Sequence, residues 1–131
     1  MSSRNAARIV ASLALALSAS AALAADKPIQ CQLDALNKAQ RARQGELITK
    51  FRAAVASHRE IPRGYLFDVS PKKIAVVEIA EWIDLEAHCC PFLDLSLEVG
   101  GGGEPVRVRL TGGKGAKEFI VAEMSPDGCK D

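Results

Sequence analysis

Two adjacent cysteines, Cys89 and Cys90, are the residues of this chain whose types and spacing are best suited to chemistry. They end the run Glu86-Ala87-His88-Cys89-Cys90, so a carboxylate and an imidazole lie close to both thiols in the sequence. Thiolates bind soft or borderline cations, of which we consider Cu(I), Zn(II) and Hg(II), and histidine or carboxylate side chains can complete such a ligand set. The run therefore predicts a metal site formed by Cys89 and Cys90 with Glu86 or His88.

A third sulfur ligand is available from Cys31, the first cysteine of the chain. Apolar and polar residues alternate around it, and we interpret residues 28–33 as a short edge strand. If this strand runs beside the end of the helix that carries Cys89 and Cys90, the three thiols converge. Cys31 is therefore a candidate metal ligand as well.

Disulfide formation is the alternative use of these cysteines. The chain has four, namely Cys31, Cys89, Cys90 and Cys129, and in an oxidising compartment four cysteines allow three pairings. A bridge between Cys89 and Cys90 would be strained, because adjacent Cα atoms are about 3.8 Å apart and disulfides usually span about 4.4–6.8 Å. The alternative prediction is a disulfide-stabilised or redox-responsive interaction module without metal, with Cys31 or Cys129 in any structural bridge.

The sequence around the cysteines favours cation capture over a reactive nucleophile. A helix C-terminus disfavours a thiolate, and the neighbouring acids Glu81, Asp84 and Glu86 add to this effect. A bound cation would reverse that balance by stabilising the thiolates.

The chain carries no complete catalytic signature. It lacks a C-x-x-C redox motif, a serine elbow and paired histidines at helical spacing. A Cys–His nucleophilic pair would need His58 or His88 placed against a cysteine with a depressed pKa. An enzyme is therefore the least favoured class.

The first 25 residues are typical of a secretory signal peptide. Arg4 and Arg8 precede an apolar run at residues 9–23, and the small residues of Ala22-Leu23-Ala24 suit a cleavage site. The run is short and rich in Ala and Ser, so we expect no membrane span. We predict a signal peptide at residues 1–25, a single domain at 26–131, and a periplasmic or secreted location.

The charge balance argues against a nucleic-acid partner. The chain has 17 basic and 16 acidic residues, and removal of Arg4 and Arg8 would leave 15 basic residues against 16 acidic ones. Among the charged residues, basic ones outnumber acidic ones at 26–73, and acidic ones outnumber basic ones from residue 74 onward. We expect these halves to attract each other within one fold or across a homodimer, and a protein partner stays open.

Hydrophobic periodicity predicts seven elements that must position these side chains. The expected elements are a strand at 28–33, a helix at 34–57 capped by Asp34, a strand at 65–69, a helix at 70–89 capped by Ser70, strands at 93–99 and 106–110, and a helix at 115–124. The order β-α-β-α-β-β-α predicts an α+β fold. It would be a two-layer sandwich, with helices on one face of a mainly antiparallel sheet.

The helix at 70–89 has faces of different character. Cys90 lies on the same apolar face as Ile79 and Ile83, so it could instead be a small buried hydrophobe. His88 falls on a more exposed face and could be a solvated residue at the helix end. Glu86 lies between the faces, within reach of either cysteine, and could instead pair with a basic residue of the first helix.

Residues 86–93 carry the motif E-x-x-C-C-P-F-L, which resembles the hallmark of a family of small, largely uncharacterised bacterial proteins. A C-x-L segment at 31–33 and an L-T-G…K-E-F ending at 110–119 match as well, so the resemblance covers most of the mature chain. Genes of this family are often found near metal-resistance genes, which implies soft-metal handling by Cys31, Glu86, Cys89 and Cys90. Many members look cytosolic, so the predicted signal peptide departs from the family's pattern.

Overall fold

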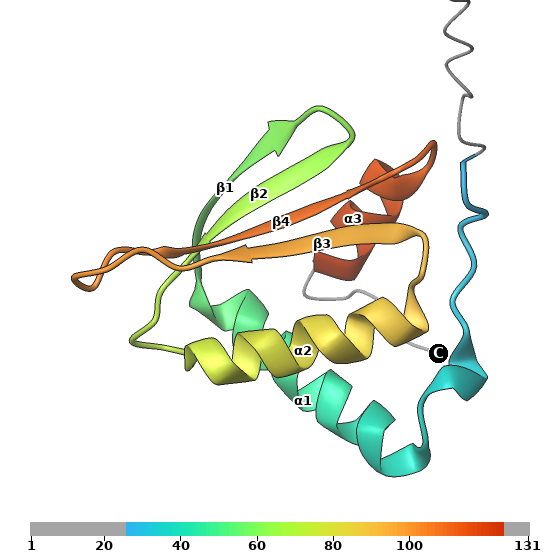
Figure 1. The fold of residues 1–131 in the computed structure, drawn as a ribbon, viewed down its shortest axis with the longest axis horizontal. Helices are drawn as coiled ribbons and strands as arrows, with labels where there is room; N and C mark the ends of the chain where they lie inside the picture. Colours follow the sequence, from blue (N-terminus) through green and yellow to red (C-terminus); the bar gives the residue numbers. More distant parts are fainter. Residues whose placement is uncertain (1–25, 125–131) are drawn as a thin grey trace, which may run out of the picture.

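The structure is a computed structural model that describes residues 26–124. Its elements are a 3₁₀ turn at Leu33–Ala35, α1 at Lys38–Ala54, β1 at Val55–Ile61, β2 at Gly64–Val69, α2 at Val76–Cys89, β3 at Leu93–Glu98, β4 at Val106–Gly112 and α3 at Ala116–Met124. The four strands form one antiparallel sheet in the order β1-β2-β4-β3. The helices lie along one side of this sheet (Figure 1). The predicted α+β class is therefore confirmed.

The core lies between the sheet and the helices. On β4, Val106, Val108 and Leu110 are buried and the alternating Arg107 and Arg109 are exposed, as expected for a strand with one covered face. From the helices, the ring of Trp82 on α2 stacks on Phe51 of α1 with 4.5 Å between centroids, and both side chains are fully buried. This contact joins the two long helices near the middle of α2.

Helix α1 begins later than predicted. Asn37 caps it in a reciprocal pair with Gln40: the Asn37 side chain accepts the Gln40 N–H, and the Gln40 side chain accepts the Asn37 N–H, both at 2.9 Å. The predicted cap, Asp34, instead lies in the 3₁₀ turn. The helix ends at Ala54, and the chain passes directly into β1.

The first strand of the sheet therefore follows the first helix instead of preceding it. Residues 28–32 belong to no strand, and the predicted strand at 28–33 was wrong. Strand β1 was missed because it is an edge strand whose central residues are polar and exposed. At the β1–β2 turn, Gly64 is required because a Cβ there would lie 1.9 Å from the Leu110 carbonyl oxygen.

Helix α2 begins at Val76, later than predicted, because residues 71–73 form turns. The Ser70 carbonyl accepts the N–H groups of Lys73 and Ile74, and the Glu78 carboxylate accepts the Ala75 N–H at 3.2 Å. At the other end, the helix stops at Cys89, as predicted from the proline at position 91.

The second hairpin and the last helix are close to prediction. Strands β3 and β4 pair Leu95 with Leu110 and Glu98 with Arg107. Phe119 of α3 makes an edge-to-face contact with Phe92, with ring centroids 4.9 Å apart. None of the helices within residues 26–124 is long and apolar enough to cross a bilayer.

Candidate metal centre

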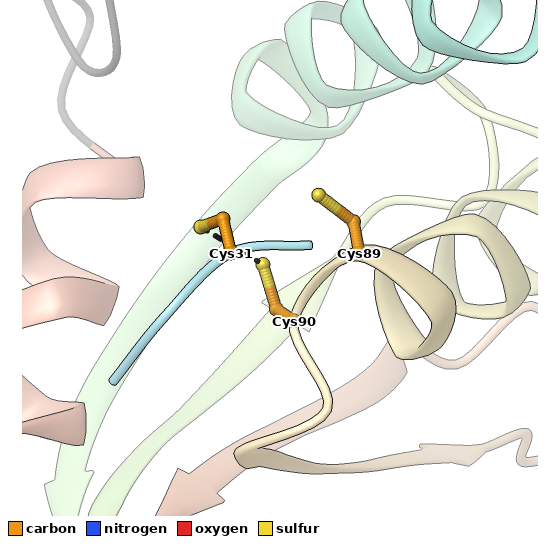
Figure 2. A group of neighbouring side chains, drawn as sticks. All are labelled: Cys31, Cys89 and Cys90. Atoms are coloured by element: carbon orange, nitrogen blue, oxygen red, sulfur yellow. Dashed lines mark hydrogen bonds between the residues drawn. The ribbon is translucent and has the colours of Figure 1, made fainter. Parts of the chain in front are cut away.

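The sulfur atoms of Cys31, Cys89 and Cys90 form one group. All three Sγ atoms lie within 4.8 Å of one another, and the Sγ atoms of Cys31 and Cys90 are 3.7 Å apart. Figure 2 shows the three side chains at the end of α2, with Cys31 on a neighbouring segment. All three are free thiols. The predicted convergence of these cysteines is confirmed.

Backbone contacts hold the group in place. Cys89 is the last residue of α2, and the Cys90 N–H donates to the Glu86 carbonyl at 2.7 Å. The N–H of Gln32 donates to the Cys89 carbonyl, also at 2.7 Å, so the segment that carries Cys31 caps the end of α2. Cys31 thus reaches the helix end without the strand that was predicted for it.

The spacing of the sulfurs suits a metal ion. A zinc–sulfur bond is about 2.3 Å, so two sulfurs bound tetrahedrally to one ion are about 3.8 Å apart. The separation of 3.7 Å between Cys31 and Cys90 is close to this value, and the limit of 4.8 Å for the whole group needs only small side-chain rotations. The group could therefore hold one soft metal ion.

Glu86 lies beside the sulfurs, outside the group of three. Its side chain is 1% exposed, and one carboxylate oxygen accepts from the Gln44 Nε2 at 2.8 Å. The Cys90 thiol and the Trp82 indole are its other polar neighbours. Burial, with a smaller contribution from Glu123, raises the pKa of Glu86 above its ordinary value. Its predicted partner in α1 is thus a neutral amide, not a basic residue.

His88 lies apart from the cysteines. Its side chain is 60% exposed, and its Nδ1 lies 2.7 Å from the Asp84 carbonyl oxygen, one helical turn back. The structure therefore does not bring this predicted ligand to the sulfur group. Cys129 lies outside the described residues.

Burial raises the pKa of both cysteines at the helix end. For Cys90, burial is the largest cause, followed by the neighbouring Glu86, Cys89 and Cys31. For Cys89, burial is again the first cause, while contact with Cys90 acts in the opposite direction. Both side chains are therefore protonated thiols at neutral pH, and a metal ion would have to displace protons to bind. Protonated thiols are also poor nucleophiles.

A cavity of about 570 Å³ opens next to the sulfurs. Its walls come from the Cys31 segment, α1, the end of α2, and α3. Its polar lining includes Arg41, Gln44, Arg52, Glu86 and Glu123, besides the three cysteines. The Nε of Arg52 is buried without a hydrogen bond, while its Nη2 donates to the Glu123 carbonyl. Because all three cysteines line this cavity, one side of the sulfur group faces open volume.

The contribution of α1 to this cavity was missed from the sequence. Arg41, Gln44, Ile48 and Arg52 recur at intervals of three or four residues and so share one side of the helix. That periodicity was readable, but it did not reveal that this side faces the cysteines.

Comparisons of the chain with protein-family models, with curated proteins and with solved structures gave no match. The function is therefore inferred from the site itself.

Proposed function

We propose that this protein is an exported protein that binds or sequesters a soft metal ion through the thiolates of Cys31, Cys89 and Cys90. The observation that carries the proposal is the convergence of three sulfur atoms within 4.8 Å from two segments distant in the sequence. Thiolate ligands select Cu(I), Zn(II) and comparable soft ions such as Hg(II). The resemblance of residues 86–93 to a family linked to metal resistance points in the same direction.

The surroundings of the sulfurs suit a cation. Glu86 is buried next to the Cys90 thiol, and each thiol that loses its proton would add negative charge to a partly closed site. An ion that binds the three thiolates would offset part of this negative charge, which burial otherwise disfavours. Glu86 would act behind Cys90, held by Gln44, as a residue that supports a ligand.

The metal proposal is tested by titrating the reduced protein with Cu(I), Zn(II) and Hg(II) under anaerobic conditions. Native mass spectrometry should show one ion per chain, and thiol alkylation should be blocked at the three cysteines. A Cys129→Ser background keeps the thiol count restricted to these residues. Cys31→Ser, Cys89→Ser and Cys90→Ser should each weaken binding strongly, because each removes a ligand.

His88→Ala is the matched control, because His88 is close in sequence but apart from the sulfurs. It should leave affinity and stoichiometry unchanged. Equal metal uptake by all three Cys→Ser variants would show that the ion binds elsewhere, and the proposal would fail.

The proposed export rests on the N-terminal sequence. Fractionation of the producing cells, followed by intact-mass measurement, should place the protein outside the cytoplasm with a chain that begins near Ala25 or Asp26. A full-length chain in the cytoplasm would contradict this part of the proposal.

The second candidate is a redox-responsive module, favoured by the short approach between Cys31 and Cys90. Their Sγ atoms are 3.7 Å apart, and a disulfide needs about 2.05 Å, so rotation of the two side chains would bring them into bonding range. A protein purified under oxidising conditions would then contain a Cys31–Cys90 bridge and retain no metal. Peptide mapping with and without reduction distinguishes the two candidates.

A further inference from the structure

The ligand group contains three sulfurs and no fourth ligand atom. Within residues 26–124, no His, Asp or Glu donor joins the set of atoms that all lie within 4.8 Å of one another. Zinc in structural sites prefers four ligands, so it would have to take the fourth from outside this group. The number of sulfurs alone therefore favours a three-coordinate centre.

The charge of the site favours the same conclusion. Three thiolates around a monovalent ion carry a net charge of −2, and around a divalent ion a net charge of −1. Either charge would lie next to the buried carboxyl of Glu86, which contacts Cys90. The guanidinium groups at the cavity, Arg41 and Arg52, are held by hydrogen bonds to the carbonyls of Leu33 and Glu123. Three thiolates around a trivalent centre carry no net charge, and burial of a neutral group costs least.

We infer that the site selects a trivalent, three-coordinate thiophilic metalloid, for which inorganic arsenite is the simplest probe. The inference rests on the proposed three-sulfur site and names the class of its ligand.

The chemistry is a ligand exchange without oxidation or reduction. As(OH)₃ and three thiols give As(S–Cys)₃ and three waters: three As–O bonds break, three As–S bonds form, and each thiol proton leaves with a hydroxide as water. Because neutral thiols react and a neutral product forms, no net proton is released to the solvent.

The open volume next to the sulfurs suits the shape of such a centre. Trivalent arsenic with three sulfur ligands is a pyramid whose fourth side carries a lone pair and needs no protein ligand. All three cysteines line the cavity of about 570 Å³, so a metalloid could enter there and bind all three sulfurs from one side. The uncharged As(OH)₃ molecule would also pass Glu86 and Glu123 without electrostatic repulsion.

The test uses the reduced full-length protein in the Cys129→Ser background, titrated with sodium arsenite under anaerobic conditions. We expect one arsenic per chain by native mass spectrometry, loss of three alkylatable thiols, and X-ray absorption that shows three sulfur neighbours and no oxygen. In Cys31→Ser, affinity should fall more than about 100-fold, beyond the 10–100-fold typical of changes outside the ligand shell. Because Cys31 lies on the exposed N-terminal segment, this variant should keep the fold, which circular dichroism checks. His88→Ala should bind as the parent does.

Parallel titrations with Cu(I) and Hg(II) separate this inference from the proposed function. If these ions protect all three thiols and arsenite is not retained, the inference is wrong and the proposed function stands. If no ion and no arsenite binds the reduced protein, both are wrong. Arsenite bound equally well by Cys31→Ser, or bound with an oxygen neighbour in the parent, would also overturn the three-sulfur centre.

Discussion

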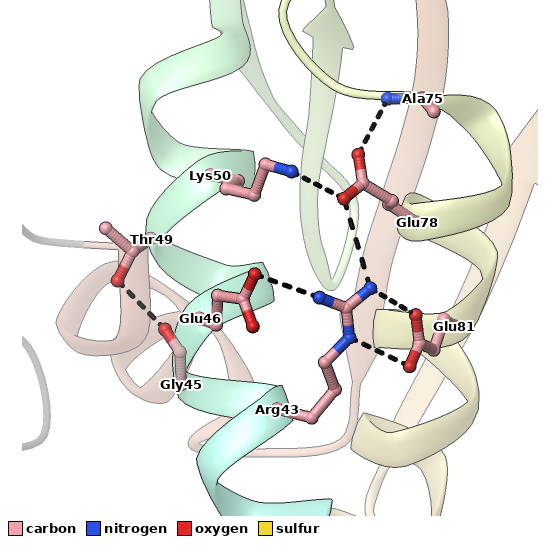
Figure 3. Close-up of polar contacts among 8 residues, drawn as sticks. All are labelled: Arg43, Gly45, Glu46, Thr49, Lys50, Ala75, Glu78 and Glu81. Atoms are coloured by element: carbon pink, nitrogen blue, oxygen red, sulfur yellow. Dashed lines mark hydrogen bonds and ion pairs between the residues drawn. The ribbon is translucent and has the colours of Figure 1, made fainter.

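The two ends of α2 differ in the environment of their polar side chains. Near its start, α2 faces α1 through ion pairs at the surface, where Arg43 contacts Glu46, Glu78 and Glu81, and Lys50 contacts Glu78 (Figure 3). The pairs with Glu78 and Glu81 join the basic first part of the chain to the acidic second part, as the sequence predicted. Near its end, α2 presents thiols and a buried carboxyl to a cavity.

The two environments shift the pKa of their carboxyl groups in opposite directions. The Arg43 guanidinium lowers the pKa of Glu81, and Lys50 lowers that of Glu78, because both carboxylates gain a charged partner. Burial raises the pKa of Glu86, whose partner in α1 is the neutral Gln44. One end of the helix is thus saturated by groups of the protein itself, whereas the other keeps polar groups that a ligand could use.

The largest expected effect comes from the residue between the two ends. Trp82→Ala should lower the free energy of unfolding by about 3–5 kcal/mol, because it removes a fully buried ring stacked on Phe51. Chemical denaturation measures the loss. Trp82→Phe keeps the ring contact and should cost clearly less. A loss below about 1 kcal/mol for Trp82→Ala would show that no common core joins the two ends.

A bound ion should stabilise the protein through the cysteine end alone. At a free metal concentration of about 100 times Kd, the free energy of unfolding should rise by about 2.7 kcal/mol. Cys31→Ser should abolish the gain, and Arg43→Gln should keep it, as measured by anaerobic denaturation with and without metal. A gain that survives in Cys31→Ser would place the ion outside the sulfur group.

The buried carboxyl should make stability depend on pH. Because the pKa of Glu86 is raised in the folded state, the folded protein holds this proton more tightly than the unfolded chain does. The stabilisation is complete below the ordinary pKa of 4.5 and is lost as pH rises through the folded value. Glu86→Gln lacks this loss, so its stability relative to wild type should improve from pH 4 towards pH 8 in denaturation experiments without metal.

Glu81→Gln provides the opposite control at the surface end. The pKa of Glu81 is lowered by Arg43, so its stabilisation is present above the ordinary pKa and is lost as pH falls. As pH rises, Glu81→Gln should therefore lose stability relative to wild type below about pH 4.5, whereas Glu86→Gln should gain stability relative to wild type above that pH. The same pH profile for both would mean that the two ends do not differ in the way described.

The smallest effect is expected for the ion pairs. Arg43→Gln should lower the melting temperature only slightly, because the pairs are exposed to water. In 1 M salt, where the Debye length is about 3 Å, the difference from wild type should disappear. Thermal melts at low and high salt measure it, and a loss that persists at high salt would indicate packing by the Arg43 side chain.

The sequence predicted well those elements whose pattern is local. Residues of β3 and β4 alternate strictly, and Pro91 ends α2 where expected. Strand β1 was missed because an exposed edge strand has no apolar alternation, and its first residues, 55–57, were assigned to the preceding helix. The start of α1 was misplaced because Asp34 and Asn37 are both good caps, and only Asn37 has a glutamine three residues later.

The candidate site shows the same division. Cys89 and Cys90 could be read as a pair from their own sequence, whereas the approach of Cys31 depends on a hydrogen bond between Gln32 and Cys89. Helical spacing put His88 on a more exposed face and Glu86 within reach of either cysteine, but both remained candidate ligands. Packing by Gln44 and Trp82 turns Glu86 inward, while His88 lies on the exposed side with Asp84.

The attachment of Cys31 to the end of α2 has a consequence for the unfolded chain. Cys31 and Cys90 are 59 residues apart in the sequence. An ion that binds both would act as a reversible crosslink around α1, β1, β2 and α2, and a covalent link that closes a loop of this length removes about 4 kcal/mol of chain entropy from the unfolded state. Loading would then also protect the N-terminal segment from proteases, and a chelator would restore its sensitivity to cleavage.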